Sequence, residues 1–348
     1  GANYLELKES NLKKDDGLYG DPSDPYGPYA SASASSSKYK SSNFSVFGNL
    51  DYLLSASLKF SIGLRWEDWE ADYSDSLQES FNPTDKMSGG KISLIKNMTN
   101  DTNMYASLAK GYKQGGFNLG LGLDANATNK NLAYDPEFLT NYELGINTKL
   151  LDSKITFNGV LFYSDREDQQ VLISTQTDPS DPNTFSFLTQ NAAEGVNHGL
   201  EINMDMGINQ SLSAFVNLGI LKTEIKNWQS RQDLKGRAQA HAPERSYALG
   251  LNWAPTSHTY LAIDFTGKSS FYYSDSHNNK SKSYVLTNLN LGYVKNNWNY
   301  ELWARNIFDE YYSVRGFYFG NEAPNFIDTL YERHGDPRHI GVSIRYDF

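Results

Sequence analysis

The sequence of 348 residues contains no cysteine, which excludes disulfide bridges and metal sites built on thiolates. It also lacks any run of about 18 apolar residues, so no membrane-spanning helix is expected. Helical periodicity is missing from every segment. No signal sequence opens the chain, which predicts a processed protein or a piece of a longer one. With a net charge of −10, the chain is not expected to bind nucleic acid.

The aromatic content is high for a chain that is polar on average. Only 39% of the residues are apolar, yet 14% are aromatic, and 24 tyrosines outnumber 18 phenylalanines and 6 tryptophans. Tyrosine and tryptophan favour positions where an apolar surface meets a polar one. The composition therefore predicts a protein in which apolar surfaces and water-exposed surfaces meet over an extensive interface.

Apolar and polar residues alternate with a period of two through most of the chain. Residues 58–66 read LKFSIGLRW, and residues 340–348 read IGVSIRYDF. This alternation is typical of β-strands with one apolar and one polar face. Glu143, Glu201 and Asp264 fall on the polar face, where a hydrated lumen could hold them but a soluble core could not hold them unpaired.

The connections between these strands alternate between very short and very long. Long loops are expected near 9–38, 117–137, 165–192 and 308–337. Tight turns at one end and long loops at the other are typical of outer-membrane barrels, whose strands need about 9–11 residues to cross the bilayer. We therefore predict an all-β, antiparallel up-and-down transmembrane β-barrel, as a single region over 1–348. A soluble sandwich with exposed strands is the alternative.

About fourteen strands are expected in this region. They lie at 2–9, 39–54, 57–74, 86–98, 103–116, 138–150, 154–174, 184–206, 211–226, 243–254, 258–272, 282–295, 298–307 and 338–348.

Several blocks of sequence resemble the barrel of TonB-dependent outer-membrane receptors. They are YASLAKGYKQGGFN at 105–118, the segment 134–171, NAAEGVNHGLEINM at 191–204, ARNIFDEYY at 304–312 and GDPRHIGVSIRYDF at 335–348. The resemblance implies a location in the bacterial outer membrane and a barrel of about 22 strands, plugged by an N-terminal domain. It also implies a short N-terminal box through which a TonB complex supplies energy. Neither plug nor box is found, so a partial barrel is expected.

The resemblance predicts a receptor that binds a scarce nutrient at its external loops, either a ferric siderophore-like chelate or an oligosaccharide. Its expected partners are the TonB complex, outer-membrane lipid and lipopolysaccharide, the barrel-assembly machinery and the substrate. No cofactor is expected, and no arrangement of residues suggests an enzyme. From the strand count alone, a self-contained fourteen-stranded passive channel is the alternative.

The segment GYKQGGF supplies the first candidate ligand-binding residues. Its glycines can shape the barrel rim, while Tyr112, Lys113, Gln114 and Phe117 would face the lumen mouth or a neighbouring strand. Ligand contact and a structural rim role both remain open.

Two further segments add candidates at strand ends. Arg166, with Gln169 and Gln170 beside it, could hold a carboxylate with both arms of its guanidinium, or could pair with the neighbouring Glu167 or Asp168. The loop 309–326 is rich in rings next to a cation, which suits sugar faces or an aromatic chelator; packing on the rim is its alternative. Its candidates are Tyr311, Arg315, Phe317, Tyr318 and Phe319.

No metal site and no catalytic residue are predicted. An acidic loop with Asp15, Asp16, Asp21 and Asp24 lacks the ligand spacing of a calcium loop. His334 and His339 flank a GDPR segment without a third ligand nearby.

The last strand presents five apolar residues on one face: Ile340, Val342, Ile344, Tyr346 and Phe348. These side chains are expected to face lipid, with Ser343 and Arg345 toward the lumen. The resemblance implies that this strand and its terminal Phe348 form the signal read by the barrel-assembly machinery. A strand that is merely amphipathic is the alternative.

Overall fold

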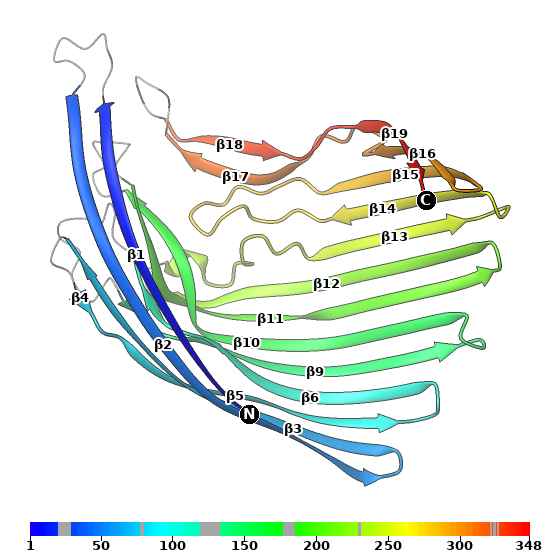
Figure 1. Cartoon of the computed structure of the whole chain (residues 1–348), viewed down its shortest axis with the longest axis horizontal. Helices are drawn as coiled ribbons and strands as arrows, with labels where there is room; N and C mark the ends of the chain where they lie inside the picture. Colours follow the sequence, from blue (N-terminus) through cyan, green and yellow to red (C-terminus); the bar gives the residue numbers. More distant parts are fainter. Residues whose placement is uncertain are drawn as a thin grey trace.

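In the computed structural model, residues 1–19, 29–76, 80–118, 133–176, 185–228, 231–320, 322, 325 and 327–348 are described. One antiparallel sheet of fourteen long strands in chain order dominates the structure (Figure 1). Its strands are β1 (Ala2–Tyr19), β2 (Tyr29–Ser55), β3 (Leu58–Asp75), β5 (Thr84–Asn97), β6 (Thr102–Lys113), β9 (Glu137–Leu150), β10 (Ile155–Gln176), β11 (Phe185–Asn209), β12 (Leu212–Trp228), β13 (Arg245–Trp253), β14 (Thr259–Lys268), β15 (Tyr284–Lys295), β16 (Trp298–Arg305) and β19 (His339–Tyr346).

The remaining elements are small and lie near the long connections. β4 (Ser80–Phe81) pairs with β3, β7 (Gly116–Phe117) pairs with β8 (Ala133–Tyr134), and β17 (Ser313–Phe319) pairs with β18 (Thr329–His334). A single 3-10 turn, η1 (Gln232–Leu234), follows β12 in the described chain. No helix in the described ranges is both long and apolar enough to cross a bilayer.

The sheet curves into an open trough with its short turns at one end and its long connections at the other (Figure 1). β1 and β19 are the two edges, since β1 pairs with β2 and β19 pairs with β16 and neither has a second partner among the described strands. The predicted all-β, antiparallel, up-and-down architecture with about fourteen strands is confirmed.

Several loop boundaries were predicted wrongly because the strands continue beyond the alternating pattern. β1 and β2 stay in register from Ala2↔Val46 up to Tyr19↔Tyr29, through most of the expected loop 9–38. β10 and β11 likewise extend through much of 165–192, and the expected loops 117–137 and 308–337 contain β7–β8 and β17–β18. Backbone hydrogen bonds alone can extend such a hairpin, so apolar alternation does not mark it.

The outer face of the sheet, defined by Leu94, Leu144 and Leu161, is a continuous apolar surface. In-register pairs join Leu94 to Leu144 through Ala106, and Leu144 to Leu161 directly. Leu144 and Leu161 are 50% and 54% exposed, which in water would cost hydrophobic free energy over a wide area. Such a face requires a lipid environment.

The opposite, inner face is polar, and several of its carboxylates are hydrogen-bonded. Asn141 Nδ2 donates to Glu143 Oε1 at 2.8 Å, and Asn288 Nδ2 donates to Asp264 Oδ2 at 2.7 Å. These two carboxylates, which a soluble core would not tolerate unpaired, are therefore hydrogen-bonded within the sheet, Glu143 from its own strand and Asp264 from the neighbouring strand.

Aromatic rings on the inner face lie across glycines of the next strand. A Cβ atom built on Gly292 would come within 2.0 Å of the Tyr260 ring, and Tyr260 Oη donates to Glu301 Oε2 at 3.2 Å. Because glycine has no side chain, the ring can lie flat on the backbone and reach the carboxylate. The in-register pairs of this kind are Tyr105–Gly145, Phe162–Gly199, Phe215–Gly250, Tyr260–Gly292 and Trp303–Gly341.

On several strands the outer face changes from apolar to charged part-way along the strand. On β3 the outward residues Leu64 and Trp66 are followed by Asp68 and Glu70, while inward Trp69 becomes 2% exposed. At about 3.4 Å per residue, the 18 residues of β3 reach about 60 Å, well beyond the roughly 30 Å of a bilayer core. The change of polarity therefore marks the membrane boundary. It recurs from Leu108 to Lys110, from Tyr163 to Asp165, from Ile220 to Lys222 and from Tyr247 to Arg245.

Candidate ligand site

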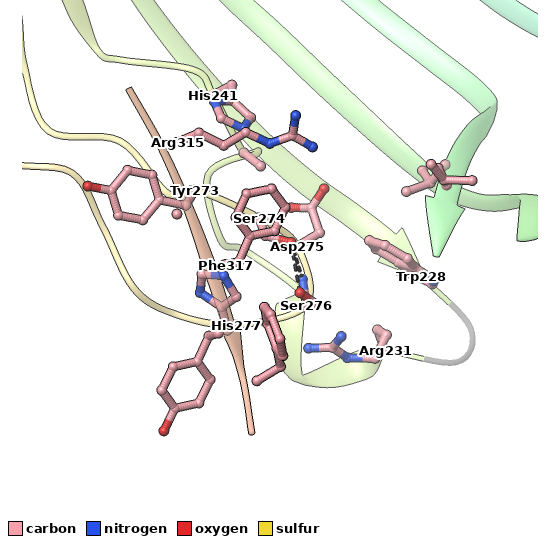
Figure 2. A pocket seen from close by; sticks show the side chains of 16 residues that line it. Trp228, Arg231, His241, Tyr273, Ser274, Asp275, Ser276, His277, Arg315 and Phe317 are labelled. Carbon is pink, nitrogen blue, oxygen red and sulfur yellow. Dashed lines mark hydrogen bonds between the residues drawn. The ribbon is translucent and has the colours of Figure 1, made fainter. Parts of the chain in front are cut away.

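A pocket of about 570 Å³ opens where the long connections meet (Figure 2). Its walls come from the end of β12, the loop between β14 and β15, and β17. Figure 2 shows Trp228 and Arg231 across the pocket from Arg315 and Phe317. The lining residues are Val171, Leu172, Trp228, Arg231, Ala240, His241, 273–277 and 315–319.

The buried guanidinium of Arg237 holds the loop between β14 and β15 in place. It donates to Asp275 Oδ1 at 2.7 Å and to the backbone oxygens of Ser274 and His277 at 3.0 and 3.1 Å. Its Cζ also lies 4.4 Å from the centre of the Tyr272 ring. A planar group with several fixed donors thereby sets the shape of one pocket wall.

Tyr273 joins this loop to the β17–β18 hairpin. Its ring fills the space that a side chain at Gly316 would need, and its hydroxyl donates to Glu332 on β18. Burial, reinforced by that hydrogen bond, raises the pKa of Tyr273 to about 12, so the hydroxyl stays protonated. The hairpin is therefore fixed against the pocket by a buried donor.

The pocket combines aromatic faces with guanidinium groups. Arg315 is exposed, its Cζ lies 4.7 Å from the centre of the Phe317 ring, and it makes no ion pair with any residue that the structure describes. Arg231, in contrast, is held by both oxygens of Asp233 at 2.9 Å. Burial lowers the pKa of His277, which favours its neutral form. Rings beside an unpaired guanidinium can bind a flat, anionic ligand.

Four predicted residues of the loop 309–326 come together here. Arg315, Phe317, Tyr318 and Phe319 all line the pocket. Tyr311 does not; it is 75% exposed, and its hydroxyl lies 2.6 Å from His334 Nε2. Ligand contact by these residues stays a prediction.

The first predicted group, around GYKQGGF, lies elsewhere and is mostly engaged in packing. Tyr112 Oη donates to Glu67 Oε2 at 3.0 Å and accepts from Arg65 Nε at 3.1 Å. Phe117 is buried against Tyr73, with ring centres 5.1 Å apart. Lys113 is exposed, and the backbone oxygen of Gln114 accepts from Gln170 Nε2 at 2.9 Å.

Arg166 is paired with a residue that the sequence did not suggest. Its Nε donates at 2.9 Å to Glu137, which is 7% exposed, rather than to Glu167 or Asp168. The Gln170 backbone donates to the other Glu137 oxygen at 3.0 Å. Gln169 is half-buried next to a register shift in β10. The local ion pair that served as the alternative was therefore wrong, because strand pairing brings Glu137 closer. Ligand contact by Arg166 and Gln169 stays a prediction.

The last strand presents its predicted apolar residues on the outer face. Ile340, Val342 and Ile344 are 61–69% exposed, and Tyr346 packs on Trp298 with ring centres 4.8 Å apart. Phe348 packs edge-on against Tyr346, with ring centres 5.1 Å apart. Their role in membrane assembly stays a prediction. The acidic loop considered above lies outside the described residues, since Asp21 and Asp24 fall on 20–28 and the side chains of Asp15 and Asp16 are not described.

Sequence comparison gives a family for most of the chain. The family described as TonB dependent receptor-like, beta-barrel, matches residues 2–307. The pesticin receptor of Yersinia pestis is 23% identical over 267 residues, which cover 74% of this chain and 36% of that protein.

Solved structures share the fold. The ferric yersiniabactin uptake receptor FyuA from Yersinia pestis superposes with a TM-score of 0.75 at 19% identity, covering 99% of this chain and 51% of that one. The siderophore receptor PiuA from Acinetobacter baumannii gives 0.73 at 16% identity, covering 99% and 52%. The chain thus spans about half the length of the solved receptors and about a third of that of the curated relative.

Proposed function

The chain belongs to the TonB-dependent receptor β-barrel family, and from this premise we propose that it forms part of the wall of a receptor for a ferric siderophore-like chelate. TonB-dependent receptor barrels are bacterial outer-membrane proteins, so the short turns face the periplasm and the long connections face the outside. The pocket between β12, the β14–β15 loop and β17 then opens outward, where a nutrient arrives.

The observation that carries the proposal is the lining of this pocket. Trp228, Tyr273 and Phe317 supply aromatic surface, and Arg315 supplies a cation that no described carboxylate neutralises. A volume of about 570 Å³ lies in the range of small-molecule sites. Proteins of similar fold are named as receptors for ferric yersiniabactin and siderophores, which supports a ferric chelate as the ligand class.

The proposal includes partners that act on the whole receptor. A TonB complex supplies the energy for uptake, the barrel-assembly machinery inserts the wall, and lipid and lipopolysaccharide surround it. The family relatives are receptors, so no catalytic role is proposed. Neither an oligosaccharide ligand nor a passive channel gains support from them.

Uptake of radioactive iron by bacteria that produce the full-length receptor tests this function. The host lacks its own ferric-chelate receptors and is offered ferric hydroxamate, catecholate and carboxylate chelates in turn, with and without a working TonB. We expect uptake of at least one chelate, lost without TonB. Uptake that persists without TonB would support the passive channel instead, and no uptake of any chelate would refute the proposal.

A matched pair of variants locates the site. Arg315→Gln removes the unpaired guanidinium, whereas Arg333→Gln removes a guanidinium from its in-register neighbour on β18, outside the pocket lining. Arg315→Gln should reduce chelate affinity about tenfold, and Arg333→Gln should leave it unchanged. Equal effects would place binding elsewhere.

A further inference from the structure

The β17–β18 hairpin carries a hydrogen-bonded network on the face that is turned away from Arg315. A register shift between Ser313 and Arg315 places Ser313 on the same face as Gly316, although residues an odd number apart point to opposite faces of a regular strand. In-register pairing puts His334 opposite Ser313, and it puts Glu332 opposite Gly316. Two polar side chains of β18 and one of β17 therefore share this face.

The network begins at the loop between β14 and β15. The Tyr273 ring lies against Gly316 on this face, and its hydroxyl donates to Glu332. The hydrogen bond from Tyr273, with a second one from Ser313, lowers the pKa of Glu332 and keeps its carboxylate ionised. One carboxylate thus connects the loop to both strands of the hairpin.

The hydrogen atoms of the network can be placed by counting donors. Ser313 has a single hydroxyl hydrogen, which is directed at the contact between Tyr273 and Glu332. The Ser313 oxygen lies 3.1 Å from His334 Nδ1, so Nδ1 must carry a hydrogen and donate to the serine. Nε2 of the neutral imidazole is then an acceptor, and the Tyr311 hydroxyl donates to it at 2.6 Å. This single arrangement satisfies the hydrogen bonds from the exposed Tyr311 to the buried Tyr273.

The opposite face of β17 belongs to the pocket. Arg315 and Phe317 project from it toward Trp228 (Figure 2). Gly316 lies between them in the strand, so the contact of Tyr273 with Gly316 from behind sets how far both side chains reach into the pocket. The shape of the pocket therefore depends on groups that a ligand does not touch.

We propose that His334, which is exposed and lies outside the pocket lining, is a positioning residue for this pocket. Its Nδ1 donates to Ser313, which keeps the serine hydrogen directed at Glu332. The carboxylate then stays in place under Tyr273, and β17 keeps its pocket face toward the ligand. The effect on chelate binding rests on the proposed function, whereas the connection between His334 and the hairpin does not.

The test measures hydrogen exchange of residues 271–277 and 313–319 by mass spectrometry in the purified full-length receptor. His334→Asn places an amide nitrogen near the position of Nδ1, so it can still donate to Ser313. His334→Gln extends its amide to the position of Nε2 and cannot. Ser313→Ala removes the middle of the network. His339→Gln is the control, since this exposed histidine begins β19, outside the hairpin and the pocket lining.

We expect His334→Gln and Ser313→Ala to raise the exchange rates of both segments about tenfold, because each removes a hydrogen bond of the network. His334→Asn and His339→Gln should exchange as the wild type does. A histidine that acted only by stacking on Tyr311, with ring centres 4.3 Å apart, would be replaced equally badly by asparagine and by glutamine. Equal rates in these two variants, or unchanged rates in Ser313→Ala, would overturn the proposal.

The same variants are compared in the uptake of radioactive iron from ferric dihydroxybenzoate, ferric acetohydroxamate and ferric citrate. For each chelate that the wild type takes up, the half-saturating concentration should rise about tenfold in His334→Gln and stay unchanged in His334→Asn. An unchanged value in His334→Gln would overturn the positioning role. Absence of uptake by the wild type would count against the proposed function, and hydrogen exchange would still decide whether His334 fixes the pocket wall.

Discussion

Arg237 and Asp275 form a buried ion pair, 2.7 Å between guanidinium nitrogen and carboxylate oxygen, that connects two loops far apart in sequence. The Arg237 side chain is only 8% exposed and Asp275 is 23% exposed. The pair builds one wall of the pocket, because the loop that carries Asp275 also carries Tyr273 and His277. Geometry at the ligand site therefore depends on a residue that does not line it.

Arg237→Ala should release this loop. Removing one partner of a buried pair leaves an uncompensated charge and costs about 3 kcal/mol, which would raise the hydrogen-exchange rates of residues 271–281 by roughly a hundredfold. Arg231→Ala is the control, since its pair with Asp233 is 31% and 59% exposed and should contribute less than about 1 kcal/mol. Unchanged exchange in Arg237→Ala would show that the loop is held by other contacts.

Gly292→Ala should destabilise the main β-sheet. The added Cβ would lie 2.0 Å from the Tyr260 ring, so the ring must move and its hydrogen bond to Glu301 is lost. We expect the free energy of unfolding to fall by about 1–3 kcal/mol. Gel electrophoresis measures this as a lower temperature at which the band of the folded protein disappears. Gly111→Ala, where no atom lies within 4 Å of the added Cβ, should behave like the wild type. An equal effect of both would indicate a general intolerance of alanine in strands.

The β14–β15 loop should loosen on mild acidification. Burial lowers the pKa of His277 below its ordinary 6.5. Above that value the imidazole is neutral whether the loop is packed or open. As the pH falls through 6.5, the open loop binds the proton first, so loop stability declines until the pKa of the packed state is passed.

Hydrogen exchange of residues 271–281 at about pH 7.5 and about pH 5.5, corrected for intrinsic rates, measures this effect. The wild type should show faster opening at the lower pH. His277→Gln should remove the difference, and His241→Gln, at the other histidine in the pocket lining, should keep it. Identical opening of the wild type at both pH values would contradict the prediction.

The alternation of apolar and polar residues was enough to predict the membrane-spanning part of the sheet. It did not predict how far the strands extend beyond the membrane. A strand in contact with lipid must show one apolar face, so the membrane-spanning parts of β3, β9 and β19 could be recognised. Above the boundary a strand no longer needs an apolar face toward lipid, and segments such as 31–37, rich in serine, gave no sign of the ladder that continues there.

The pocket could be predicted only in part, for a related reason. Arg315 and Phe317 were found because rings and a cation lie close together in sequence. Trp228 and Asp275 are 47 residues apart in sequence and are brought together only by the pairing of β12, β13 and β14. The partner of Arg166 was missed in the same way, since Glu137 reaches it through the pairing of β9 with β10.

The terminal Phe348 offers a test of assembly that is separate from stability. Its ring contacts Tyr346 edge-on and is otherwise open to the surroundings, so its packing contributes little to the folded wall. We expect deletion of Phe348 to reduce the amount of receptor inserted in the outer membrane severalfold while the inserted fraction keeps its melting temperature.

Phe308→Ala, which truncates another phenylalanine that is 75% exposed, should change neither quantity. Phe348→Trp should restore insertion if an aromatic terminus is what the assembly machinery reads. Normal insertion of the deleted form would instead favour a last strand that is merely amphipathic.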